Sequence, residues 1–396
     1  MNPAPAAVPR LARRTEAIAP FQVMELVKQA TLLAQQGHPI IHLSIGEPDF
    51  TAPPSVIEAL ECAARAGRAQ YTPAVGTPEL RAAIAEDTWR RHGVRIAPER
   101  VVITAGASAA LTLACCALVN PGDEVLLTDP SYPCNRHFVA AFDGVPIGVR
   151  VGPESRFQMT ADALSAHWTD RTAGTLLASP ANPTGTSIPF DELARIVEAV
   201  RVRHGFTLVD EIYIGLSHTE ARVRSALELG DDILVCNSFS KVFQMTGWRL
   251  GWLVVPPQMV PVVEKLAQNL MICASALAQH AALSCFEPDT LAIYDERRRT
   301  LTARRDALIP QLQALGFGIP VIPDGAFYLW LDCSRFGNSS VVAQRLLHEA
   351  HVSVVPGHDF GANDPERWLR LSYAAPIEVL EQAVARMAPV LARMAS

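Results

Sequence analysis

Residues 237–252, NSFSKVFQMTGWRLGW, place one lysine, Lys241, in a stretch that is mostly apolar, aromatic and small. A charged amine is costly to bury unless it is paired or neutralised. The chain also makes little use of lysine, because only Lys28, Lys241 and Lys265 contribute to its 34 lysines and arginines. Lys28 and Lys265 lie in helix-like stretches and are predicted to face solvent. Lys241 therefore needs a chemical explanation.

The composition is that of an ordinary globular protein. The chain has 396 residues, 49% hydrophobic and 19% charged, with a net charge of −6, which leaves room for two or three domains. No long block of like charge indicates a nucleic-acid partner, and no uncharged apolar run reaches the roughly 18 residues of a membrane span. The first residues lack the apolar core of a secretory signal. The eight cysteines form no C-x-x-C pair and no cluster with metal-ligand spacing, so we expect free thiols in the cytoplasm and no metal site.

Short apolar runs alternate with longer amphipathic ones in the first two thirds of the chain. Strands are predicted at 101–104, 124–128, 173–178, 206–209, 233–235 and 250–255, and helices at 108–119 and 190–204. Near-continuous apolar strands that alternate with helices favour an α/β domain with a mostly parallel central sheet. We place this large domain at residues 47–285.

The remainder follows a different pattern. The expected elements are a long charged helix at 286–316, a strand at 326–331, a helix at 339–350, a strand at 352–355 and a final helix from 376. This order predicts a smaller α+β domain at 286–396, joined by residues 1–46, which form an N-terminal arm and part of that domain.

Polar residues follow several of the predicted strands, at the edge of a parallel sheet where ligands bind. Asp210 comes directly after strand 206–209, either to cap the next helix or as a buried carboxylate that holds a cation such as a protonated ring nitrogen. Tyr213 follows it by three residues. Asn182 lies in SPANPTG (179–185), which is either a plain Pro/Gly turn or a site where its amide binds a ligand oxygen.

A second group of residues suits phosphate. In TAGASAAL (104–111) a strand runs through small residues into a helix, and backbone N–H groups at such a helix start bind anions. The pattern matches neither glycine-rich nucleotide motif, and tight packing is the alternative. Ser238, Ser240 and Arg249 surround Lys241 with hydroxyls and a guanidinium, which also suit phosphate.

Lys241 itself is the nucleophile in this arrangement. A neutral amine attacks carbonyl carbon, and desolvation near other cations lowers its pKa. Arginine cannot form a Schiff base, which explains a lysine at this position. An aldehyde-reactive amine, a phosphate site, a carboxylate for a ring nitrogen and an amide for a ring oxygen together indicate pyridoxal 5'-phosphate.

The motifs resemble the class I/II, aspartate-aminotransferase-like family of fold-type I pyridoxal-phosphate enzymes over nearly the whole chain. They are SIGEPD (44–49), YTPAVG (71–76), DPSYP (129–133), SPANPTG (179–185), DEIY (210–213), SFSK (238–241), VPGHDFG (355–361) and RLSYA (370–374). The resemblance implies a three-layer α/β/α large domain with a mostly parallel sheet and a smaller α+β domain.

The resemblance also implies roles around the cofactor ring. Lys241 forms the Schiff base and moves the substrate's Cα proton. Asp210 pairs with the pyridinium nitrogen. Asn182 and Tyr213 bond the phenolic oxygen, and Tyr132 stacks on the ring. Tyr132 and Asn182 also face the substrate.

Further implied roles concern the phosphate and the subunits. Ser238, Arg249 and the backbone of Ala107 and Ser108 hold the phosphate, with Ser240 as a weaker candidate. Tyr71 resembles a tyrosine that reaches the phosphate of the neighbouring subunit, which implies a homodimer with shared active sites.

For the substrate, Arg370 resembles the arginine that clamps the α-carboxylate, where a bidentate pair selects α-amino acids, and the backbone of Gly46 assists. The alternative for Arg370 is a salt-bridged surface arginine. Tyr328 and residues 19–24 resemble a lid over the substrate side chain.

The implied reaction moves an amino group from an L-α-amino acid to a 2-oxo acid by a ping-pong mechanism. Phe21, Val23 and Met24 suit a neutral, apolar or aromatic donor, and Ser108 stands where some members that act on acidic substrates carry lysine. We expect 2-oxoglutarate or pyruvate as acceptor.

Other functions share these motifs or this fold. A β-elimination lyase of the carbon–sulfur type, or a synthase of aminocyclopropane carboxylate, shares the first steps. A ligand-sensing domain of a transcription regulator needs a DNA-binding module, for which the 45 residues before the first cofactor motif leave no room. Lys241 argues against a structural protein that has lost catalysis.

Overall fold

The computed structural model describes residues 10–20 and 22–395. Its centre is a seven-stranded sheet with the order β2-β8-β7-β6-β5-β3-β4. The strands are β2 (Val101–Thr104), β3 (Glu124–Asp129), β4 (Val145–Arg150), β5 (Thr172–Ala178), β6 (Phe206–Asp210), β7 (Leu234–Ser238) and β8 (Gly251–Val254). Only β8 runs against its neighbours in this sheet, so the mostly parallel sheet is confirmed. The carboxyl ends of β2, β5, β6 and β7 therefore meet at one edge.

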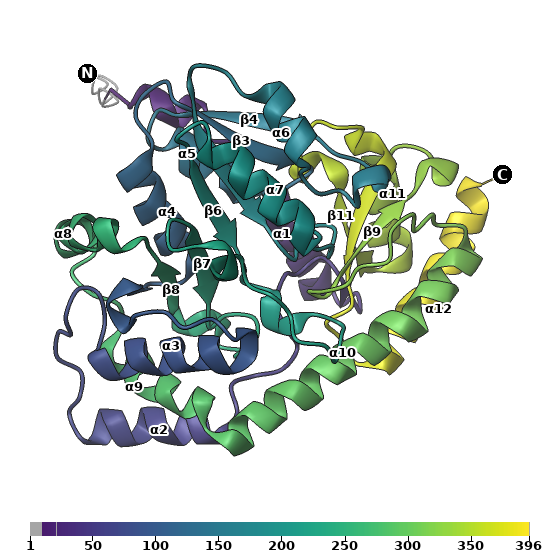
Figure 1. The fold of residues 1–396 in the computed structure, drawn as a ribbon. Helices are drawn as coiled ribbons and strands as arrows, with labels where there is room; N and C mark the ends of the chain where they lie inside the picture. Colours follow the sequence, from purple (N-terminus) through teal and green to yellow (C-terminus); the bar gives the residue numbers. More distant parts are fainter. Residues whose placement is uncertain (1–9, 21, 396) are drawn as a thin grey trace, which may run out of the picture.

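Helices cover both faces of this sheet (Figure 1). Successive side chains of a strand point to opposite faces, and adjacent residues such as Leu208 and Val209 accordingly belong to two different apolar clusters. On one face lie α4 (Ala107–Leu118), α5 (Pro133–Ala140) and α8 (Val260–Leu270). On the other lie α3 (Pro78–His92), α6 (Ala161–His167), α7 (Phe190–Arg201) and α9 (Ala276–Ala282). This is the predicted three-layer α/β/α arrangement.

A second group of elements comes from the two ends of the chain. Helix α10 (Pro288–Leu315) runs from beside α2 (Pro54–Arg65) to the last helix, α12 (Ile377–Met394) (Figure 1). Strands β9 (Tyr328–Asp332), β11 (Val355–Pro356) and β12 (Trp368–Ser372) form a three-stranded antiparallel sheet. Helix α1 (Gln22–Gln35) packs on this sheet. The domain limits at residues 46 and 285 stay a prediction.

Three local predictions were wrong or incomplete. The strand predicted at 352–355 is two strands, because β10 (Val352–Ser353) pairs with β1 (Ile41–His42) and β11 pairs with β12 in another sheet. The helix predicted at 339–350 is α11 (Ser339–Arg345) followed by a π-helical turn at Leu346–Ala350. Strands β4 and β12 were not predicted.

None of the helices in the described residues combines the length and the apolar character that crossing a membrane requires.

Candidate active site

A cavity of about 440 Å³ opens at the carboxyl edge of the large sheet. It brings together residues that are far apart in the sequence and that were predicted to form one site. Its lining includes Gly46, Ala107, Ser108, Tyr132, Asn182, Asp210, Tyr213, Ser240, Lys241, Arg249, Tyr328 and Arg370. Val23 and Met24 of α1 also line it, whereas the predicted contact of Phe21 lies outside the described residues.

Lys241 follows β7 and points its amine into this cavity. Its Nζ donates a hydrogen bond to the carbonyl oxygen of Gly46. Burial lowers the pKa of the amine to about 8, the positive charges of Arg370 and Arg249 act in the same direction, and the carboxylates of Glu47 and Asp210 oppose the shift. At pH 7 this shift raises the neutral fraction of the amine to about a tenth, which makes it a better nucleophile and base than an ordinary lysine.

Asp210 ends β6 and is 7% exposed. Its Oδ1 accepts the backbone N–H of Ile212 at 3.0 Å. The next helical turn, Ile214–Leu216, has no side-chain cap, so helix capping does not explain this carboxylate. Burial raises its pKa to about 6, against the N–H of Ile212 and the charge of Lys241. A buried carboxylate that accepts one hydrogen bond from the described residues can also receive a cationic N–H from a ligand.

The part of the cavity lining formed by α4 and Arg249 is suited to an anion. Helix α4 begins at Ala107, and its first N–H groups have no acceptor within the helix. Gly106 has a φ of 83°, and a Cβ there would lie 2.5 Å from Nη2 of Arg249. The guanidinium therefore lies directly against the turn, with its Nη1 bonded to the carbonyl of Thr246 at 2.9 Å.

The two serines before Lys241 differ in position. Ser240 lines the cavity. The Ser238 hydroxyl lies behind it and donates toward the oxygens of Ser240 and Leu250, at 2.9 and 3.1 Å. Ser240 therefore lines the cavity and Ser238 lies behind it. Which of the two serines would contact a phosphate stays a prediction.

Arg370 comes from β12 and is 2% exposed. It donates from Nη1 to Oδ1 of Asn182 at 2.9 Å and from Nη2 to the carbonyl of Ser44 at 2.6 Å. Its Nε is buried without a hydrogen-bond partner in the structure. The alternative of a salt-bridged surface arginine is therefore excluded for Arg370. A buried guanidinium that lines a cavity suits a carboxylate.

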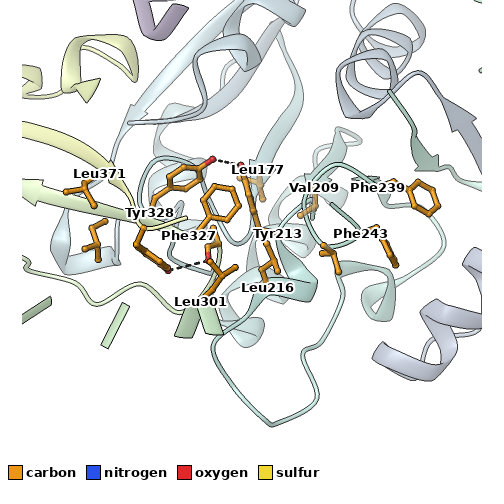
Figure 2. Packing of buried hydrophobic residues seen from close by; sticks show 14 of the residues in the cluster. Leu177, Val209, Tyr213, Leu216, Phe239, Phe243, Leu301, Phe327, Tyr328 and Leu371 are labelled. Carbon is orange, nitrogen blue, oxygen red and sulfur yellow. Dashed lines mark hydrogen bonds between the residues drawn. The ribbon is translucent and has the colours of Figure 1, made fainter. Parts of the chain in front are cut away.

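Two tyrosines close the cavity beside this arginine. The hydroxyls of Tyr213 and Tyr328 lie 2.9 Å apart in a hydrogen bond, and their rings meet edge to face with Phe327 packed against both (Figure 2). Burial raises the pKa of both phenols, so both stay protonated. One hydroxyl donates to the other within this pair, and the accepting hydroxyl keeps its own O–H for a ligand. A Cβ on Gly46 would lie 2.7 Å from the Tyr328 hydroxyl, which explains a glycine there.

These features fit pyridoxal phosphate. The cavity offers an amine of lowered pKa, a buried carboxylate with capacity for a cationic N–H, and a helix start with an arginine for a phosphate. The guanidinium of Arg370, which lines the cavity, adds donors for a substrate carboxylate. Tyr71 does not line the cavity and is 87% exposed in the single chain.

The fold and cavity define an α/β enzyme with a buried lysine at the carboxyl edge of its sheet. The chain belongs to the class I and II aminotransferase family, whose profile matches residues 38–387. It is an aminotransferase, and the family generally depends on pyridoxal phosphate.

Individual relatives match over almost their full length. The chain is 37% identical to a valine–pyruvate aminotransferase of Mycobacterium tuberculosis, covering 93% of this chain and 96% of the relative. It is 34% identical to an aspartate/prephenate aminotransferase of Thermus thermophilus, covering 97% and 99%. A crystal structure of an aminotransferase from M. tuberculosis superposes with a TM-score of 0.93 at 37% identity, covering 98% of this chain and all of the other.

Several lining residues were not predicted. They are Val27, Ile45, Glu47, Leu111, Ala178, Pro180, Ile212 and Thr246. Val27 follows Val23 by four residues, so helical spacing contained a usable signal for it. Glu47 lies inside a recognised motif, where it accepts a hydrogen bond from Thr246.

Proposed function

We propose that the protein moves an amino group between a neutral, apolar or aromatic L-α-amino acid and a 2-oxo acid, with pyridoxal phosphate as cofactor and a ping-pong mechanism. The observation that carries this proposal is the buried amine of Lys241, which shares one cavity with Asp210 and Arg370. A structural lysine would not require a carboxylate and a buried guanidinium in the same space.

The residues that would hold the cofactor divide by chemistry. The phosphate would bind the start of α4 at Ala107 and Ser108, together with Arg249 and the serines Ser238 and Ser240. The ring would be held by Asp210, Asn182, Tyr213 and Tyr132. When bound through Lys241, the cofactor supplies an electron sink for the charge left on Cα after its proton is removed.

The chain's own groups perform the remaining work. Arg370 binds the α-carboxylate in the bidentate manner of a planar guanidinium, and Asn182 orients it through the 2.9 Å bond. Lys241, once its amine is free, is positioned to hold the Cα proton, because a pKa of about 8 lies close to the working pH of a general base. The packed tyrosines Tyr213 and Tyr328 keep water away from that proton.

The side-chain specificity rests on an apolar wall. Val23, Met24, Val27, Ile45, Leu111 and Ile212 line the cavity, and apolar surface favours an apolar substrate side chain. The cations that line it among the described residues are Lys241, Arg249 and Arg370. All three have roles, so among the described residues no lining cation of the same chain is left for the distal carboxylate of an acidic donor. The name of the M. tuberculosis relative, valine–pyruvate aminotransferase, supports an apolar donor with pyruvate as one acceptor.

We also propose a homodimer and a cytoplasmic setting. The side chain of Tyr71 is free to reach a second copy, since it is 87% exposed. Eight unpaired cysteines fit a reducing compartment.

The test is a half-reaction screen. Protein reconstituted with pyridoxal phosphate is mixed with single amino acids, without any 2-oxo acid, and released 2-oxo acid is quantified. One equivalent per site from leucine, valine or phenylalanine, with none from aspartate, supports the proposal. Continuous release of pyruvate and ammonia from a cysteine-type donor would instead assign a β-elimination lyase, and no release from any amino acid would refute both.

A further inference from the structure

The 357–363 loop is fastened to the segment that carries Tyr132. The backbone N–H of Ser131 donates to the carbonyl of Phe360 at 2.9 Å. The Asp129 carboxylate accepts two backbone N–H groups further along the loop, at 3.0 and 3.3 Å. This loop therefore keeps a fixed position relative to the cavity.

Inside the loop, Asp359 is 2% exposed, and its Oδ2 accepts the backbone N–H of Val23 at 3.2 Å. Val23 is the second residue of α1, so its N–H is one of those without an acceptor in the helix. A carboxylate at this end is also favoured by the helix dipole. The next residue, Phe360, packs on Arg370, and the Cζ of the guanidinium lies 4.9 Å from the centroid of the Phe360 ring.

The first turns of α1 form part of the cavity wall, through Val23, Met24 and Val27. The Val23 side chain is buried in a cluster with Trp330 and Phe360, while Met24 is half exposed. A shift of this first turn would therefore change the apolar wall and leave Lys241 and Asp210, which lie on other elements, in place.

We propose that Asp359 is a positioning residue for donor specificity: its carboxylate holds the first turn of α1 against the cavity and so sets the affinity for the donor's apolar side chain. The proposal rests on the proposed function, because it assumes that α1 contacts that side chain. It assigns a role to a buried carboxylate that binds neither the cofactor nor the substrate carboxylate.

The experiment compares Asp359→Ala, which removes the acceptor, with Asp359→Asn, which keeps an oxygen and loses the charge. The matched control is Asp332→Ala, because Asp332 also accepts a backbone N–H, from Ser334 at 2.9 Å, but does not line the cavity. Two readouts are taken: hydrogen exchange of residues 22–35 in the ligand-free protein, and half-reactions of the reconstituted enzyme with leucine and with alanine.

We expect Asp359→Ala to raise the half-saturating leucine concentration about 10-fold, the equivalent of one charge-assisted hydrogen bond. The half-saturating concentration of alanine should change less than about 2-fold, and exchange in 22–35 should accelerate. Asp359→Asn should show the same two effects on leucine and on exchange at a smaller size, because its oxygen still accepts the N–H of Val23 but carries no charge. The Asp332→Ala control should match the wild type in the half-saturating concentrations of leucine and alanine and in the exchange of residues 22–35. Equal effects on leucine and alanine, or unchanged exchange, would overturn the proposal.

If Asp359→Ala does not fold, the proposal is tested by hydrogen exchange of the Asp359→Asn variant alone. Unchanged exchange of residues 22–35 in that variant would again overturn the proposal. Failure of the wild type to use any apolar donor would refute the proposed function, and the exchange experiment would still test the Asp359 contact.

Discussion

Replacing Asp210 by asparagine should stabilise the cofactor-free protein while it abolishes most of its activity. The carboxylate is 7% exposed, and burial raises its pKa from 3.8 to about 6. The folded state therefore binds more protons than the unfolded state between these pH values, and stability is lost as the pH rises through the folded pKa. At pH 7 the ionised carboxylate lowers the stability of the folded protein by the full amount of about 3 kcal/mol, from a shift of about two pKa units at 1.36 kcal/mol each.

Asparagine resembles the protonated acid in size and polarity, and its oxygen can still accept the N–H of Ile212. For a chain of this length a gain of about 3 kcal/mol raises the melting temperature by roughly 4 °C. The gain should shrink when the melts are repeated at pH 5. In the reconstituted enzyme, loss of the ionic partner for the ring should lower kcat/KM by about 100-fold or more.

Glu211 is a matched control for this experiment. It is the next residue, is 4% exposed, and its pKa is raised by burial to about 7, but it lies outside the cavity and bonds Ser225 and Ala226. Glu211→Gln should leave activity within about 3-fold. If Asp210→Asn destabilises the cofactor-free protein at pH 7, or if its activity is retained, Asp210 is a structural residue and the assignment is wrong.

Three other substitutions probe the remaining parts of the site. Lys241→Met should abolish transamination and stabilise the cofactor-free protein by about 3 kcal/mol at pH 7, from a shift of about 2.5 pKa units at 1.36 kcal/mol each. Because the lysine pKa is lowered from 10.5 to about 8, that gain should fall as the pH rises from 8 to 10.5, and a gain independent of pH in urea titrations would contradict the burial argument. Arg370→Lys loses the planar fork of the guanidinium and should lower kcat/KM about 100- to 1000-fold. The same substitution at the exposed Arg367 should leave kcat/KM unchanged. Equal effects at the two positions would refute the binding of the substrate carboxylate by Arg370. Met24→Ala should lower kcat/KM for leucine about 5-fold and spare alanine, and a uniform loss in steady-state kinetics would refute contact with the side chain.

The central strands could be predicted because they are buried on both faces and read as continuous apolar runs. Strand β4 has the sequence VPIGVR and is exposed at several positions along the sheet edge, so burial leaves little apolar pattern in it. The division of the predicted strand 352–355 into β10 and β11 at Val354 could not be predicted either. The sequence VSVV is uniformly apolar or small, and nothing in it marks a change of sheet.

The candidate site was predictable where a residue follows a strand, as Asp210 and Lys241 do. The sequence does not predict which of the two serines, Ser238 or Ser240, has its hydroxyl facing the cavity, because a two-residue spacing does not determine it. The contact of Asp359 with Val23 joins residues 336 positions apart, and no local pattern encodes such a pair. The composition of the chain does not predict this contact either.

The central claim is that Lys241 is the amine that holds the cofactor. The chain contains only two other lysines, Lys28 and Lys265, which makes a labelling experiment decisive. Protein reconstituted with pyridoxal phosphate is reduced with borohydride, digested, and mapped by mass spectrometry. The account predicts one phosphopyridoxyl group per chain, on Lys241. Absence of the label under saturating cofactor, or its location on Lys28 or Lys265, would contradict it.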